Sequence, residues 1–148
     1  MKNNQRLSGY MKEANLHINR LKKTLKALPY PFEPKDLDEE ILDKLDVLAF
    51  RFSKLQSLVG EKLFREYLSL FYDVEGKSFL ELLKLLEKEG ITDIDTWSEI
   101  RKIRNFISHD YPLIDEEKVK AINFLIENLN IIFEIVEKIE SRLNEIDL

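Results

Sequence analysis

The residues whose types can support chemistry stand together in one segment, which reads Arg101-Lys-Ile-Arg104-Asn105-Phe-Ile-Ser-His109-Asp-Tyr111-Pro112. On a helix, the apolar side of this segment consists of Trp97, Ile100, Ile103 and Ile107. Arg104 lies about 40° from Ile100, at the edge of that apolar side. A guanidinium there needs a carboxylate, a carbonyl or a bound anion. The position therefore predicts either a structural ion pair with another helix or a phosphate clamp in a cleft.

The second candidate, His109, stands five residues after Arg104, which places the two side chains about 140° apart on a straight helix. They converge only if Pro112 ends the helix near them or if a second copy of the chain supplies the partner. Within one helix, His109 faces Asn105, four residues earlier. Taken alone, His109 is interpreted as a residue at a helix C-terminus, where the dipole favours a positive charge.

Several other kinds of chemistry are excluded by composition. The chain has no cysteine, which removes disulfides, thiolate metal sites and thiol nucleophiles. It has two histidines, too few for a histidine-rich metal centre within one chain, and His17 is interpreted as structural. The sequence also lacks a glycine-rich phosphate loop, an HExxH motif and an acidic calcium loop. We therefore expect no metal and no cofactor.

The elements that must position these residues are helices. Apolar residues make up 44% of the 148 residues, and only four glycines and four prolines are present, so we expect one all-α domain over 1–148. Spacings of three and four predict a mostly antiparallel bundle of four long helices and a shorter one. The expected elements are a helix over 7–28, a connector over 29–34, a helix from Asp36 to about 71 with an interruption at Gly60, a short helix over 79–86 capped by Gly90, a helix from a capping box at Thr96 to about His109, and a last helix from Asp115.

Charge is distributed unevenly along the chain. The net charge is −5, yet residues 1–30 hold seven basic residues and a single acidic one, Glu13. This basic first helix is interpreted either as a solvated lysine face or as a surface that attracts phosphate. The polar N-terminus and the absence of a long uncharged apolar run predict a cytoplasmic protein with no membrane contact.

The string Arg104-Asn105-x-x-x-His109-x-Tyr111 resembles the R-x4-H-x-Y motif of the HEPN superfamily, in particular of the HepT-like toxins. The wider pattern W-x5-I-R-N-x3-H-D-Y-P over 97–112 is similar to the usual sequence pattern of that family, as is the segment Phe50–Gln56. The likeness extends over the whole chain in length and helix order, although its specific residues lie in 97–112.

This resemblance implies a helical bundle that dimerises and brings two copies of the motif together. The implied reaction is metal-independent RNA cleavage, in which the 2′-hydroxyl attacks the adjacent phosphate. His109 would act as general base or acid, Arg104 would stabilise the phosphoryl charge, and Asn105 would orient the imidazole or contact the phosphate. The neighbouring Arg101 and Lys102 are the expected RNA contacts.

The resemblance also implies a partner. HepT-like toxins are paired with an MntA-like antitoxin, an MNT-type nucleotidyltransferase that attaches AMP to the tyrosine found here as Tyr111. A bulky anion beside the cleft would then occupy or repel the RNA phosphate.

Two alternatives stay open. The chain is either a non-catalytic substrate-binding or scaffold subunit of a nucleotidyltransferase, which its acidic body favours, or a helical interaction protein in which Arg104 and His109 form a structural pair.

Overall fold

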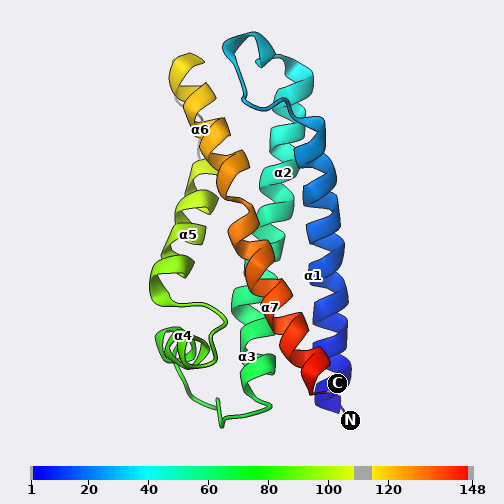
Figure 1. Cartoon of the computed structure of the whole chain (residues 1–148), viewed down its shortest axis with the longest axis vertical. Helices are drawn as coiled ribbons and strands as arrows, with labels where there is room; N and C mark the ends of the chain where they lie inside the picture. The colour runs from blue at the N-terminus through cyan, green and yellow to red at the C-terminus, as the bar shows by residue number, and fades with distance from the viewer. Residues whose placement is uncertain (1, 109–114, 147–148) are drawn as a thin grey trace.

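A computed structural model describes residues 2–108 and 115–146 of the chain. All regular secondary structure in these two ranges is helical, which confirms the all-α prediction (Figure 1). The elements are α1 (Lys2–Ala27), η1 (Pro34–Asp36), α2 (Glu39–Leu58), η2 (Val59–Leu63), α3 (Phe64–Leu68), α4 (Phe79–Lys88), α5 (Ile94–Ser108), α6 (Asp115–Asn128) and α7 (Asn130–Glu145).

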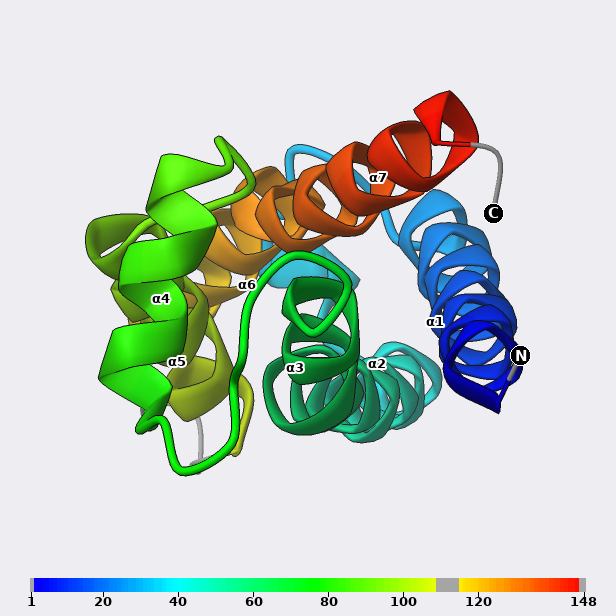
Figure 2. The same cartoon turned by 90° about the horizontal axis from the view of Figure 1, so that it is seen from below.

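The long helices run up and down along one axis. In Figure 1, α1 rises, α2 descends into α3, α5 rises, and α6 descends into α7, so neighbours along the chain are antiparallel. Figure 2 shows that α4 is the exception, because it lies crosswise at the end of the bundle where α1 begins. A hydrogen bond of 2.8 Å from Asn15 Nδ2 to Glu140 Oε2 joins α1 to α7.

The second long helix, α2, begins later in the sequence than expected. We expected that helix to begin near Asp36, but this boundary is wrong, because Pro34–Asp36 forms a separate 3-10 turn. The cap of α2 is Asp38, whose carboxylate accepts from the amide of Ile41 at 2.9 Å. The connector is fixed to α6 by Asn123, whose side-chain amide accepts from the nitrogen of Phe32 at 2.7 Å and donates to its oxygen at 3.0 Å.

The irregularity expected at Gly60 is present, but the helix does not break there. Val59–Leu63 is a single π-helical segment that links α2 directly to α3. A Cβ on Gly60 would stand 2.9 Å from Cζ2 of Trp97, so only glycine allows the α5 indole to approach this backbone so closely. Gly60 therefore allows close contact between η2 and α5.

The short helix α4 has well-formed ends. Ser78 and Glu81 form a capping box at its start. At its end, Gly90 adopts φ +71, and the amide of Ile91 bonds to the oxygen of Leu86 at 3.0 Å, as in a Schellman motif. The C-terminal role predicted for Gly90 is confirmed.

We expected α5 to start with a capping box at Thr96, and this prediction is wrong. The helix begins at Ile94, and Asp93 caps it by accepting from the amide of Thr96 at 2.7 Å. Hydrogen bonds from the backbone amide and the side chain of Thr96 lower the pKa of the Asp93 carboxyl, because they favour its ionised form. Thr96 thus lies in the first turn as the donor.

The last helix is not continuous, contrary to expectation. It is interrupted at Leu129, between α6 and α7. The side chain of Asn128 donates to the oxygen of Phe124 at 2.7 Å, which competes with the backbone ladder at this point. A second apolar row on this region, Ile132, Ile135, Ile139 and Ile146, was open to interpretation as core or as a subunit interface; its first three residues are buried in the core, whereas Ile146 is exposed.

Most of the core is one apolar cluster with residues from α1 to α7, and a smaller cluster lies around the connector at Phe32.

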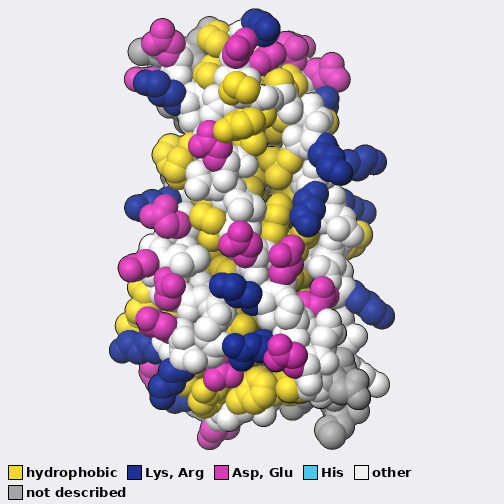
Figure 3. Space-filling view, viewed as in Figure 1, with side chains coloured by type: hydrophobic (Ala, Val, Ile, Leu, Met, Phe, Trp, Pro, Cys, Tyr) yellow, Lys and Arg dark blue, Asp and Glu magenta, His cyan; other side chains and the backbone are white. Residues whose placement is uncertain are grey.

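None of the helices within the described ranges is long and apolar enough to cross a membrane. Figure 3 shows acidic and basic side chains interspersed over one face of the bundle. The described basic side chains of α1 are exposed: Arg6, Lys12, Arg20, Lys22, Lys23 and Lys26. Two of them approach acidic residues, with Nη1 of Arg6 3.6 Å from Oε1 of Glu66 and Nζ of Lys22 3.9 Å from Oε1 of Glu137. Such pairs are typical of a solvated charged surface.

Candidate functional site

The helix α5 presents its apolar side to the core as predicted. Trp97, Ile100, Ile103 and Ile107 are all buried. Arg104, however, is exposed, and no carboxylate within the described ranges forms an ion pair with it. Of the two alternatives predicted for Arg104, the structural ion pair with another helix does not form among the described residues, and the phosphate clamp stays a prediction.

Arg104 borders a pocket of about 330 Å³ between the α2–η2 segment, α4 and α5. The pocket has an aromatic side and a polar side. Its lining residues are Gln56, Ser57, Gly60, Glu61, Arg65, Phe79, Leu82, Trp97, Arg101 and Arg104. Trp97, Arg101 and Arg104 share one face of α5, because their spacing of four and three residues returns them to nearly the same side.

Phe79 and Trp97 form the aromatic side of the pocket, and both rings pack against the ring of Phe64. The Trp97 ring centroid lies 4.9 Å from that of Phe64 and 5.8 Å from that of Phe79, and both pairs are tilted. Phe64 is fully buried, whereas Phe79 is half-buried and Trp97 is only 3% exposed. Tilted contacts of this kind favour a fixed arrangement of rings. The pocket therefore has a stiff aromatic wall.

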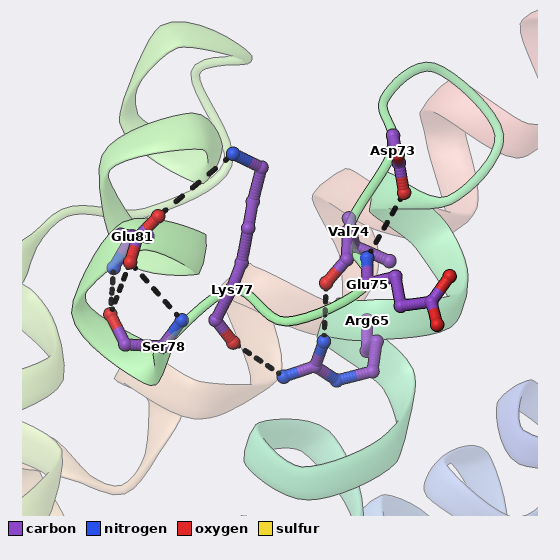
Figure 4. Close-up of polar contacts among 7 residues, drawn as sticks. All are labelled: Arg65, Asp73, Val74, Glu75, Lys77, Ser78 and Glu81. Atoms are coloured by element: carbon purple, nitrogen blue, oxygen red, sulfur yellow. Dashed lines mark hydrogen bonds and ion pairs between the residues drawn. The ribbon is translucent and has the colours of Figure 1, made fainter.

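Arg65 holds the turn that leads into α4, as Figure 4 shows. The Arg65 guanidinium donates to the backbone oxygens of Val74 at 2.8 Å and of Lys77 at 3.1 Å. This fork holds the turn that leads into the capping box of α4, whose first residue is Phe79. Arg65 is thus a positioning residue, with two of its donors directed at the turn.

The remaining basic and polar residues of α5 differ in whether they contribute to the pocket. The Arg101 guanidinium carbon lies 5.7 Å from the centroid of the Phe79 ring, so Arg101 packs against one ring of the aromatic wall. Lys102 lies outside the pocket and pairs with Glu99 at 3.1 Å. Asn105 is exposed and also lies outside the pocket lining.

The structure thus brings Arg101 and Arg104 to one pocket and leaves Lys102 and Asn105 outside its lining. His109 and Tyr111, the other two residues of the predicted site, lie outside the described residues. Within those residues, no group of three or more His, Asp or Glu side chains is arranged to hold a metal ion.

Sequence reasoning missed the part of the pocket that comes from other elements. Gln56 is only 5% exposed although it lies on the otherwise apolar stripe of α2, and its Oε1 accepts no hydrogen bond among the described residues. Glu61 supplies a carboxylate from η2. A polar residue inside an apolar stripe is a signal that is visible in sequence, whereas the contact with Glu61 depends on tertiary packing.

The histidine interpreted as structural, His17, is buried in α1. Burial lowers its pKa, an effect that the nearby Glu13 partly opposes. It does not line the pocket.

Comparison with protein-family models, with curated proteins and with solved structures found no match to this chain.

Proposed function

We propose that this chain is a HEPN-type ribonuclease toxin that acts as a homodimer. In this proposal it cleaves RNA without a metal ion, and an MNT-type nucleotidyltransferase neutralises it by attaching AMP to Tyr111. The observation that carries the proposal is the run Arg104-Asn105-x-x-x-His109-x-Tyr111, which begins on α5. The exposure of Arg104 beside a pocket gives additional support, because a phosphate-binding guanidinium must be accessible.

The proposed chemistry uses groups that this sequence supplies. His109 removes the proton from the 2′-hydroxyl or protonates the leaving 5′-oxygen, since imidazole titrates near neutral pH. Arg104 donates to the phosphoryl oxygens as charge grows on them. The products are a 2′,3′-cyclic phosphate and a 5′-hydroxyl. Because Arg104 and His109 are about 140° apart on a straight helix, the proposal assigns each site contributions from two chains.

An Arg104 series tests this role of the guanidinium. Arg104→Ala should reduce RNA cleavage by a factor of about 10² to 10³, as expected when a donor to a developing oxyanion is removed. Arg104→Lys should recover only part of that loss, because it restores the charge without the planar fork. Lys84→Ala is the matched control, since Lys84 is exposed on α4 and lies outside the pocket. Full activity of Arg104→Ala would exclude Arg104 from the reaction.

The second candidate is a non-catalytic substrate-binding or scaffold subunit of a nucleotidyltransferase. The net charge of −5 and the interspersed charges in Figure 3 favour it, because much of such a surface does not attract RNA. Stable binding of a nucleotidyltransferase, together with no cleavage by protein that is unmodified at Tyr111, would select this candidate.

A further inference from the structure

We propose that the pocket beside Arg104 binds a nucleobase of the RNA and prefers guanine. This inference rests on the proposed function and adds to it the base that lies next to the phosphate on Arg104. In the proposal, the base edge lies between the guanidinium groups of α5 and the carboxylate of Glu61, and its face contacts the aromatic wall.

The size and lining of the pocket suit a flat heterocycle. Its volume of about 330 Å³ is at the lower end of the range for small-molecule sites. Phe79 is half-buried and therefore offers part of its ring to the pocket. Arg101 already lies over that ring, at 5.7 Å from its centroid. Unpaired RNA bases are commonly recognised by stacking on aromatic rings and on guanidinium planes.

The charges on the pocket lining favour guanine among the four bases. Arg101 and Arg104 provide donors, whereas Glu61 provides a carboxylate acceptor. Guanine matches both, since its O6 and N7 accept from a guanidinium and its N1–H and N2–H groups donate together to a carboxylate. Adenine and cytosine each offer a single amino group, and uracil a single N–H. Glu61 is therefore the residue expected to determine the preference.

Gln56 supports a polar ligand rather than a purely apolar one. It is 5% exposed, it lines the pocket, and its Oε1 has no hydrogen-bond donor among the described residues. A buried amide oxygen without a donor is costly. A base N–H or a water molecule bound with the base would satisfy this amide.

The chain contains its own reporter for the test. Trp97 is the sole tryptophan and lines the pocket, so its fluorescence responds to a base bound there. Protein confirmed by mass spectrometry to be unmodified at Tyr111 is titrated with 5′-GMP, 5′-AMP, 5′-CMP and 5′-UMP, and with ribose 5-phosphate as the probe without a base. We expect 5′-GMP to bind about tenfold more tightly than the other nucleotides, and ribose 5-phosphate to leave the fluorescence unchanged.

Two variants test the assigned carboxylate. Glu61→Gln should remove the preference for 5′-GMP, whereas Glu75→Gln, an exposed glutamate outside the pocket, should retain it. Equal binding of all four nucleotides, an equal response to ribose 5-phosphate, or no response to 5′-GMP would each overturn the inference.

Parallel cleavage assays separate this inference from the proposed function. Cleavage that shows no preference for guanine beside the cut overturns the base assignment and leaves the ribonuclease proposal standing. Selective binding of 5′-GMP without RNA cleavage supports the pocket assignment and overturns the ribonuclease proposal.

Discussion

Replacing Gly60 with alanine tests whether the close contact between η2 and α5 is as tight as the structure indicates. The new methyl carbon would stand 2.9 Å from Cζ2 and 3.5 Å from Cη2 of Trp97. The indole has little room to retreat, because it packs against the rings of Phe64 and Phe79. We therefore expect the substitution to destabilise the fold and to shift the environment of Trp97.

Two opposing effects set the magnitude. Alanine gains about 1 kcal/mol over glycine in a helix interior. Forcing a methyl group into a well-packed region costs about 1–3 kcal/mol. The steric cost should exceed the gain in helix propensity, so Gly60→Ala should lower the free energy of unfolding by about 0–2 kcal/mol. Gly9 in α1 is the matched control, since nothing lies within 4 Å of the position that its Cβ would take. Gly9→Ala should therefore stabilise the protein by about 0.5–1 kcal/mol.

The assay is urea denaturation followed by circular dichroism and by Trp97 fluorescence, which report the helices and the pocket wall respectively. The two variants should move the unfolding midpoint in opposite directions, and only Gly60→Ala should change the native fluorescence. If Gly60→Ala stabilises the protein as much as Gly9→Ala does, the close approach of Trp97 to this backbone is refuted.

Three further predictions concern the cap of α5, a buried histidine and the connector after α1. Asp93→Ala should lower the free energy of unfolding by about 1 kcal/mol and Asp93→Asn by less, because Asp93 caps α5; equal urea midpoints for wild type and the alanine variant would contradict this. Because burial lowers the pKa of His17 from its ordinary value of 6.5, the unfolded state binds more protons, so stability should decrease as the pH falls below about 6.5, and His17→Gln should reduce this slope in urea midpoints measured against pH. Asn123→Ala should cost about 1–3 kcal/mol, because it leaves both peptide groups of Phe32 without their partner; thermal unfolding at the wild-type temperature would disprove that role.

The helices and the buried face of α5 were predictable from sequence, because burial follows the helical period. Trp97, Ile100, Ile103 and Ile107 recur at spacings of three and four and are all buried. The boundaries were less predictable, since Asp93 and Thr96 are both good caps and the sequence alone does not choose between them. The interruption at Leu129 coincides with a hydrogen bond from the Asn128 side chain to Phe124, which no apolar pattern contains.

The candidate site was predictable only where it lies on one helix. A helical wheel places Arg104 at the edge of the apolar side, but it does not show whether a neighbouring helix or water faces that edge. The pocket depends on Phe79, which the fork of Arg65 positions from another element. Gln56 and Glu61 join it through packing of the α2–η2 segment against α5. Contacts between elements that are distant in sequence determine this geometry.

The most direct test of the ribonuclease proposal is RNA cleavage in the presence of EDTA, comparing wild type with His109→Ala. Both proteins are first shown to be folded by circular dichroism and unmodified at Tyr111 by mass spectrometry. The proposal predicts that wild type alone cleaves RNA and leaves 2′,3′-cyclic phosphate ends. Undiminished cleavage by His109→Ala, or no cleavage by either protein, would contradict it.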